Sequence, residues 1–276
     1  IVAVPTPVLK NNKPDLTYLK KSCETIGKYL NKEDIVFFES TVYPGITENY
    51  CGKILQKVSG LKLDTDFFVG YSPERINPGD KKHSIDKIIK IVSANKSYAL
   101  KIGKVIYQKV AKKIILNKNI KEAESAKVIE NIQRDLNIGL MNEIYKVCLN
   151  SKINFSNVIK LSSTKWNFFR FNPGLVGGHC LPVDPYYYSY FAKSYGISTE
   201  ILLAGRRVNN SMFKFIFKKI KNHLKNKNLK FKKSKILILG LSYKKNVSDL
   251  RNSYVIKLAE LIKKNSLKLD IYDPLI

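Results

Sequence analysis

A glycine-rich segment that leads into a cysteine and a carboxylate carries the clearest chemistry in the sequence. Residues 177–188 read GGHCLPVDPYYY, with Cys180 after the glycines and Asp184 four residues further on. Glycines let backbone approach a ligand closely, and a cysteine with a polar neighbour is typical of a covalent nucleophile. The segment fits a buried cysteine at a loop corner equally well. A dyad of Cys180 with His179 is not indicated, because adjacent side chains on an extended segment point apart.

Polar residues also follow three apolar segments near the start of the chain. The segments are Ile1–Val4, Ile35–Glu39 and Phe67–Tyr71, and helical patterns lie between them. This alternation predicts parallel β-strands, whose carboxyl ends share the edge where ligands bind. Taken singly, a Ser or Thr there is better explained as a helix cap or turn residue, but their recurrence at one end of successive strands favours a crevice. The polar residues expected to line it are Thr6, Ser40, Thr41 and Glu74.

The longest helical pattern runs from Glu122 to Leu149. Its apolar residues recur at steps of three and four. Lys127 and Asn131 are four residues apart, which places them on the same face of the helix. Alone, this pair is better explained as part of a solvated face, and it becomes a candidate site only beside other polar groups.

The remaining segments complete an α/β pattern with a helical middle. Short strands are expected at 87–92 and 112–116, on either side of a helix at about 97–109. Helices are expected at 155–161 and from 185 to about 225. A strand at 235–240, a helix at 253–264 and a strand at 269–273 then predict one βαβ unit.

Composition narrows the class of protein. The 276 residues are 44% hydrophobic, with 14 Gly and 10 Pro, which is typical of a globular protein of two modest domains or one large domain. The four cysteines contain no CxxC pair and the three histidines show no metal-site spacing, so a reducing compartment and no bound metal are expected. With neither a signal-peptide pattern nor an apolar run long enough to span a membrane, we expect a soluble, cytoplasmic protein.

The charge is strongly positive, with 49 Lys and Arg against 22 Asp and Glu and a net charge of +27. Such a charge first suggests nucleic-acid binding. The lysines are nevertheless spread through the chain among Asn and Ile, as in residues 219–228, which favours a compositional bias. We expect no nucleic-acid and no membrane partner, and a positive field that attracts small polyanions such as nucleotides.

Seven motifs follow one another in the order of a known family. They are VPTP (4–7), STVYPG (40–45), YSPERINPGD (71–80), EAESAKVIENIQRDLN (122–137), NPGLVGGHCLPVDPYY (172–187), GRRVNNSM (205–212) and GLSYKKNVSDLRNS (240–253). Together they resemble the UDP-glucose/UDP-N-acetylhexosamine 6-dehydrogenases, a family of nucleotide-sugar dehydrogenases. The YSPERINPGD and GGHC forms resemble its bacterial branch, which acts on UDP-N-acetylhexosamines for surface polysaccharides.

The resemblance implies an enzyme that uses NAD to oxidise the C6 hydroxyl of a UDP-sugar twice, to a carboxylate. It implies that Cys180 is the nucleophile, forming first a thiohemiacetal and then a thioester. The other implied catalytic roles are oxyanion stabilisation by Lys127 and Asn131, positioning of water and Lys127 by Asp184, base catalysis of thioester hydrolysis by Glu74, and water holding by Thr41.

The resemblance also implies two sets of ligand contacts. Those to NAD are Val4, Pro5, Thr6, Pro7, Ser40, Thr41 and Arg251. Those to the UDP-sugar are Glu74, Arg75, Ile76, Asn77, Lys127, Asn131, Phe171, Asn172, Pro173, Gly174, Leu175, Gly177 and Lys244. Arg206 and Asn209 are further candidates for substrate contact.

The fold implied by the resemblance is α/β, with two Rossmann-like parallel-sheet domains joined by a central all-helical domain. The expected boundaries are 1–118 for the NAD-binding domain, 119–230 for the central domain and 231–276 for the start of the UDP-binding domain. A homodimer through the central helices is expected.

The sequence departs from the family at its ends. It contains no GxGxxG turn, the motif that cradles the NAD pyrophosphate, and both Rossmann-like domains are expected to be incomplete. We therefore expect the chain as given to bind NAD poorly and to be inactive. Two alternatives stay open: a UDP-glucose 6-dehydrogenase, and an inactive truncated homologue that only dimerises.

Overall fold

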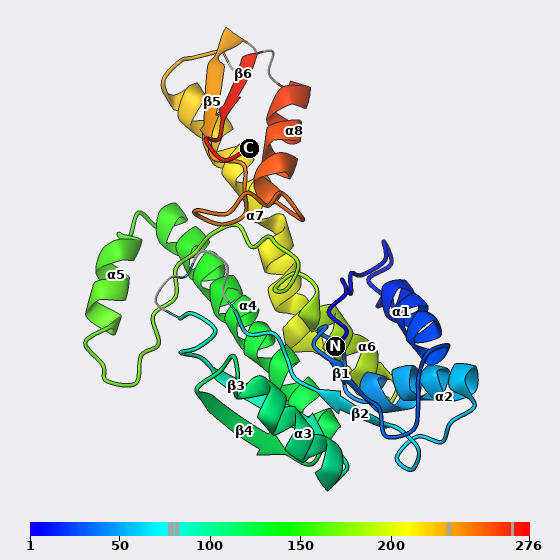
Figure 1. The fold of residues 1–276 in the computed structure, drawn as a ribbon. Helices are drawn as coiled ribbons and strands as arrows, with labels where there is room; N and C mark the ends of the chain where they lie inside the picture. Colours follow the sequence, from blue (N-terminus) through cyan, green and yellow to red (C-terminus); the bar gives the residue numbers. More distant parts are fainter. Residues whose placement is uncertain (77–79, 81–82, 231–232, 266–267) are drawn as a thin grey trace. The chain divides into compact units, whose positions relative to one another are not determined.

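The computed structural model describes residues 1–76, 80, 83–230, 233–265 and 268–276 (Figure 1). The chain divides into two compact units, which are described separately. Unit 1 comprises residues 1–131 and 183–198, and unit 2 comprises residues 132–182 and 199–276. The fold class is α/β with a helical central region, as the sequence predicts.

Unit 1 is built on a four-stranded sheet in the order β1-β2-β3-β4. The strands are β1 (Ile35–Phe38), β2 (Phe68–Tyr71), β3 (Ile89–Ala94) and β4 (Lys113–Asn117). The pairs β1–β2 and β3–β4 are parallel, whereas β2 and β3 are antiparallel. The strand-and-helix pattern did not predict this antiparallel pair. Among the described residues between β2 and β3 no helix intervenes, and an antiparallel pair needs no crossover helix.

The strand expected at Ile1–Val4 is reduced to a single parallel bridge between Val2 and Phe38. The Val2 N–H donates to the Phe37 carbonyl at 2.8 Å, and the Glu39 N–H donates to the Val2 carbonyl at 2.9 Å. The prediction of a full strand was therefore wrong, although the segment does lie beside β1. Pro5 has no N–H to donate, which limits how far this pairing extends.

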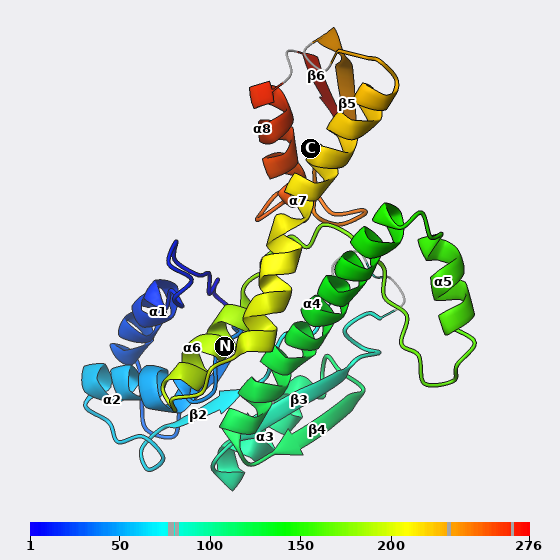
Figure 2. The ribbon, with the colours of Figure 1, turned by 180° about the vertical axis from the view of Figure 1, so that it is seen from behind.

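Helices cover both faces of this sheet. On one face they are α1 (Thr17–Gly27), the π-helical turn η1 (Thr47–Gly52), α2 (Lys53–Ser59) and the first part of α4 (Ile120–Asn150), and on the other face α3 (Ser97–Tyr107). Helix α6 (Asp184–Lys193) belongs to the same unit. Helix α3 packs against β2, β3 and β4, and α1 lies beside α2 (Figures 1 and 2).

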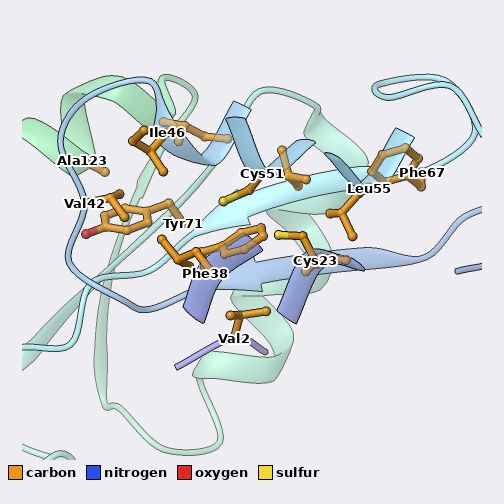
Figure 3. Packing of buried hydrophobic residues seen from close by; sticks show 14 residues of the cluster. Val2, Cys23, Phe38, Val42, Ile46, Cys51, Leu55, Phe67, Tyr71 and Ala123 are labelled. Carbon is orange, nitrogen blue, oxygen red and sulfur yellow. The ribbon is translucent and has the colours of Figure 1, made fainter. Parts of the chain in front are cut away.

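Successive residues of β1 point into two different cores, as the pleat of a strand requires. Phe38 belongs to a buried cluster with residues of α1, η1, α2 and the start of α4, in which Cys23 and Cys51 are fully buried (Figure 3). Phe37 points to the opposite face and packs with Val92 and Tyr107 under α3. Gly70 and Gly103 leave the space that the Phe37 ring fills.

Unit 2 contains the rest of α4 and a small βαβ unit. Its other elements are α5 (Phe155–Ser162), α7 (Glu200–Asn226), β5 (Lys235–Leu239), α8 (Tyr254–Asn265) and β6 (Lys268–Tyr272). Strands β5 and β6 pair in parallel with α8 as their connection, so the predicted βαβ unit is confirmed. Helix α7 packs against α8 (Figure 2). The helical region predicted from 185 to about 225 is two helices, α6 and α7, separated at 194–199.

No helix in the described part of the chain combines the length and the apolar character that crossing a membrane requires.

Candidate functional site

The strand-end loops predicted to share a crevice are hydrogen-bonded to one another in unit 1. The Val4 N–H donates to Ser40 Oγ at 2.9 Å, and Ser40 Oγ donates to the Val4 carbonyl at 2.7 Å. Thr6 Oγ1 donates to the Thr41 carbonyl at 2.7 Å. The Tyr187 hydroxyl of α6 reaches the Thr6 carbonyl at 2.8 Å, so α6 lies against the same loops.

Glu74 is joined both to the end of β1, at Glu39, and to helix α4. Its N–H donates to the Glu39 carbonyl at 3.5 Å. Its carbonyl accepts a hydrogen bond from Lys127 Nζ, whose side chain is almost completely buried. The Glu74 carboxylate accepts the Ile76 N–H. Glu74 and Lys127, which are 53 residues apart in sequence, are thus neighbours in the fold.

Asn131 and Asp184 form a second buried contact, one turn along α4 from Lys127. Asn131 Nδ2 donates to Asp184 Oδ2 at 2.6 Å, and Asp184 is only 1% exposed. Asp184 opens helix α6, where Pro185 occupies the first turn. Since Lys127 and Asn131 are both buried, the solvated-face explanation for this pair was wrong.

Arg75 contacts protein groups through all three of its guanidinium nitrogens. Its Nη2 lies 2.6 Å from Glu130 Oε1 on α4, its Nε 3.3 Å from Glu130 Oε2, and its Nη1 2.8 Å from the Ile89 carbonyl. Buried Lys90 supports the same loop, because it pairs with Glu39 at 3.2 Å and lies 3.5 Å from the Pro73 carbonyl. Ile76 is exposed, and Asn77 lies outside the described residues.

The Cys180 loop belongs to unit 2, where it packs against the coil between β5 and α8. Gly178 has φ +91°, which favours glycine, and a Cβ there would lie 2.7 Å from the Tyr243 ring. The two glycines before the cysteine therefore make room for a tyrosine of the protein. Cys180 itself is partly exposed, whereas Cys23, Cys51 and Cys148 are buried, so the buried-cysteine explanation does not hold for Cys180.

The loop predicted to hold the UDP-sugar, residues 171–177, is fixed at its centre by Asn142 of α4. Asn142 Nδ2 donates to the Gly174 carbonyl at 3.0 Å, and the Gly174 N–H donates to Asn142 Oδ1 at 2.8 Å. Asn142 also donates to Asn209 Oδ1 of α7 at 2.8 Å. In this loop Phe171, Pro173 and Leu175 are half-buried, Asn172 is exposed and Gly177 is buried.

Arg206 and Asn209 lie in a buried network with Asp135. Arg206 Nη1 is 2.5 Å from Asp135 Oδ1, and Asn209 Nδ2 donates to the same oxygen at 2.8 Å. Arg206 is 1% exposed and Asn209 is fully buried, so within unit 2 these side chains join α4 to α7.

Arg251 and His179 both approach Asp249. Arg251 Nη2 is 2.6 Å from Asp249 Oδ2, and this hydrogen bond lowers the pKa of Asp249 and raises the pKa of Arg251. His179 Nδ1 lies 3.9 Å from the same carboxylate. The Lys244 carbonyl accepts the Ser242 hydroxyl at 2.8 Å.

Comparison with known proteins decides the family. Residues 1–111 match the NAD binding domain of the UDP-glucose/GDP-mannose dehydrogenase family, residues 121–211 its central domain, and residues 237–276 its UDP binding domain. The chain belongs to this family.

Several relatives are similar to this family member over nearly its whole length. Protein CapL of Staphylococcus aureus is 48% identical over 274 residues, and UDP-N-acetyl-D-glucosamine 6-dehydrogenase of Pseudomonas aeruginosa is 44% identical over 275. Each alignment covers 99% of this chain and 65% of the relative, so the chain spans about two thirds of their length. The solved structure of UDP-D-ManNAc dehydrogenase from Pyrococcus horikoshii matches with a TM-score of 0.91 and 32% identity, covering 99% of this chain and 64% of that one.

Glu124 is a buried carboxylate that the sequence reasoning missed. It is fully buried on α4, one turn before Lys127, and accepts the Gly45 N–H at 2.5 Å and the Thr47 N–H at 2.9 Å. Burial raises the pKa of Glu124 to about 7, although these hydrogen bonds oppose the rise. It thus ties α4 to the STVYPG loop, at a glycine with φ +92°. The only sequence signal is its place on the same helix, three residues before Lys127.

Other positioning residues were also missed, because each is recognisable only by its partner. They are Glu130, Asn142, Asp135, Tyr187 and Tyr243. Across the described ranges, no group of three His, Cys, Asp or Glu side chains is arranged to hold a metal ion.

Proposed function

We propose that this chain carries the catalytic residues for the NAD-dependent, four-electron oxidation of the C6 hydroxyl of a UDP-N-acetylhexosamine to the uronate, in the biosynthesis of a surface polysaccharide. The observation that carries the proposal is the buried polar set on α4, in which Asn131 bonds Asp184 at 2.6 Å and Lys127 bonds the Glu74 backbone. Family membership supports the reaction class, and the Pseudomonas aeruginosa relative, named as a UDP-N-acetyl-D-glucosamine 6-dehydrogenase, supports the substrate class.

The strand-end loops fit the nicotinamide half of NAD. The hydroxyls of Ser40 and Thr6 are bonded to backbone carbonyls of neighbouring loops, which fixes these loops without any ligand. NAD, when bound, accepts a hydride in each of the two oxidation steps. We assign its contacts to Ser40, Thr41 and Arg251 and to the segment Val4–Pro7, which comprises Val4, Pro5, Thr6 and Pro7.

Cys180 forms the covalent link between the two oxidations. Loss of a hydride from C6 and a proton from its hydroxyl gives the aldehyde. The Cys180 thiolate adds to it, and the oxyanion takes up a proton to give a thiohemiacetal. Loss of a second hydride and proton gives a thioester, and water releases the carboxylate and regenerates the thiolate. Cysteine suits both steps because a thiolate is a strong nucleophile and a good leaving group.

Buried and half-buried residues of unit 1 supply charge stabilisation and proton transfer. Lys127 and Asn131 donate to the developing oxyanion, because preorganised donors stabilise charge most where water is excluded. Asp184 orients the Asn131 amide through their hydrogen bond and positions the water. Glu74 is the base that activates this water, and Thr41 holds it.

We assign the UDP-sugar to the segment around Gly174, to the loop that follows β2, and to Lys244. The Asn142 contacts that preset the backbone at Gly174 support this assignment. The residues are Phe171, Asn172, Pro173, Gly174, Leu175, Gly177, Glu74, Arg75, Ile76, Asn77, Lys127, Asn131 and Lys244. Of these, Arg75 already contacts Glu130 and Ile89, so its part is to hold the loop in place.

We also propose three functional domains, at 1–118, 119–230 and 231–276, and a homodimer through the central one. The ranges of the three family matches support these boundaries. Leu140 and Val147, seven residues apart on α4, are 54% and 60% exposed, which supports an apolar contact with a second copy. Replacing both with Glu converts a dimer to a monomer in light scattering if this contact holds.

The experiment that tests the oxidation measures NADH and the uronate product with UDP-GlcNAc, UDP-GalNAc, UDP-ManNAc and UDP-glucose. It uses the chain itself and a fusion that adds the preceding segment of the Pseudomonas aeruginosa relative. The expected result is two NADH per uronate with a UDP-N-acetylhexosamine and a thioester mass on the Cys180 peptide. Cys180→Ser abolishes the thioester, whereas Cys148→Ser, at a buried thiol, retains it. No NADH from either protein with any of the sugars overturns the proposal.

A further inference from the structure

The loop that carries Cys180 and the coil between β5 and α8 are interlocked within unit 2. A Cβ added at Gly177 would lie 2.6 Å from Tyr243 Cβ and 2.8 Å from the Asn252 carbonyl. A Cβ added at Gly178 would meet the Tyr243 ring, with its nearest atom at 2.7 Å. Real Cβ atoms do not approach so closely, so Tyr243 packs directly on both glycines.

Both backbone polar groups of Gly178 are also bonded to this coil. The Gly178 N–H donates to the Arg251 carbonyl at 3.1 Å, and Asn252 Nδ2 donates to the Gly178 carbonyl at 3.0 Å. Asn252 has φ +52°, a conformation that Asn tolerates better than most residues. The residue two positions before Cys180 is therefore held at its N–H, its carbonyl and its Cα.

The coil is itself fixed to the βαβ unit. Asp273, directly after β6, accepts the N–H groups of Leu241 and Ser242 at 2.7 and 3.2 Å. Ser253 Oγ donates to the Leu241 carbonyl at 2.6 Å and so closes the coil. A continuous series of contacts therefore runs from the end of β6 through the coil to the Cys180 loop.

Electrostatic interactions agree with this packing. Burial raises the pKa of the Tyr243 hydroxyl, with further contributions from Asp249 and Cys180, and Arg251 opposes them.

We propose that Tyr243 and Asn252 are positioning residues for Cys180, which they hold through Gly177 and Gly178, and that uridine diphosphate bound by the coil 240–253 changes the exposure of the Cys180 thiol. The second half rests on the proposed function, which assigns a UDP-sugar contact to Lys244 in this coil, and on the match of residues 237–276 to the UDP binding domain of the family. The nucleophile is then presented by the same segment that recognises the nucleotide, so an empty nucleotide site leaves the thiol less well placed.

The test measures the rate at which iodoacetamide alkylates Cys180, followed by peptide mass, with and without UDP. The other three cysteines are buried, so they provide an internal reference. Tyr243→Ala is expected to raise the Cys180 rate several-fold and to abolish the effect of UDP on it. Tyr243→Phe keeps the ring and is expected to behave as wild type. Tyr29→Ala removes a tyrosine that is 78% exposed in unit 1 and serves as the matched control.

Asn252→Asp provides a second, milder variant, because Asp tolerates the same backbone conformation but cannot donate to the Gly178 carbonyl. It is expected to raise the Cys180 rate without lowering the melting temperature measured alongside. Wild-type rates in both Tyr243→Ala and Asn252→Asp overturn the positioning role. An absence of any UDP effect in the wild type overturns the coupling and the assignment of UDP to this unit, whereas the basal rates still decide the positioning role.

Discussion

Replacing Glu124 with Gln is expected to change how the stability of the protein depends on pH. The carboxylate is fully buried between α4 and the STVYPG loop, and burial raises its pKa from an ordinary 4.5 to about 7. The nearby charge of Glu48 adds to the rise, and hydrogen bonds from Thr47 and Gly45 oppose it. The amide of the Glu124→Gln variant would keep one acceptor for the loop but would carry no titrating proton.

The sign and size of this change in stability follow from the coupling between proton binding at Glu124 and folding. Because the folded protein binds this proton more tightly than the unfolded chain, the stabilisation is fully present below about pH 4.5 and is lost as the pH rises through about 7. At about 1.4 kcal/mol per tenfold change in proton affinity, the loss amounts to about 3 kcal/mol. The free energy of unfolding of the wild type, relative to Glu124→Gln, therefore falls by about that amount between these limits.

Urea unfolding of both proteins across this pH range measures the difference, and carbon-13 NMR of labelled Glu side chains measures the pKa directly. Glu143→Gln, at an exposed position of the same helix, is the control and is expected to show no such trend. The reasoning is refuted if the difference between wild type and Glu124→Gln stays constant with pH, or if no Glu titrates above its ordinary range.

Three further predictions concern packing and charge. Asp135→Ala leaves the buried Arg206 guanidinium without its carboxylate partner and is expected to lower the free energy of unfolding by about 3–5 kcal/mol. The double variant with Arg206→Met is expected to recover most of this loss. Equal urea midpoints for wild type and Asp135→Ala would contradict the prediction. Glu130→Gln removes the partly exposed ion pair with Arg75 and is expected to lower the free energy of unfolding by at most about 1 kcal/mol. It is also expected to raise the rate of hydrogen exchange at residues 73–76, the segment that contains Glu74. Gly70→Ala drives a methyl group into the Phe37 ring and is expected to cost about 1–3 kcal/mol in thermal unfolding. Gly174→Ala, where the added carbon meets no atom of the described residues within 4 Å, should melt as wild type.

Most elements of the fold were predictable because they show a clear period. The helix found at Ile120–Asn150 was expected at 122–149, and the strands at Ile35–Phe38 and Lys235–Leu239 were expected within one or two residues. The structure of Ile1–Val4 was not predicted correctly. Four apolar residues before a proline have the same sequence pattern whether they form a full strand or pair at Val2 alone. The sequence of a single strand does not indicate whether it runs parallel or antiparallel to its neighbour, so the antiparallel pairing of β2 with β3 was not predicted.

The site was predictable where chain spacing alone brings residues together. Lys127 and Asn131 share a face of one helix, and this was clear from their separation. Their burial was not, because it depends on Glu74 and Asp184, which are more than 50 residues away. Tyr243 illustrates the limit most clearly: the glycines before Cys180 suggested space for a ligand, but a side chain distant in sequence fills it.

The paired hydrogen bonds between Asn142 and Gly174 have a consequence for how these two positions can evolve. Only a side-chain amide offers a donor and an acceptor side by side, so neither Asp nor Leu can replace Asn142 without losing a bond to the loop. Gly174 takes part only through its backbone, and a methyl group there would meet no atom of the described residues within 4 Å. Packing within the protein thus restricts substitution of Asn142 but does not restrict substitution of Gly174. A glycine kept at this position among relatives would therefore support the UDP-sugar contact that we propose for this segment.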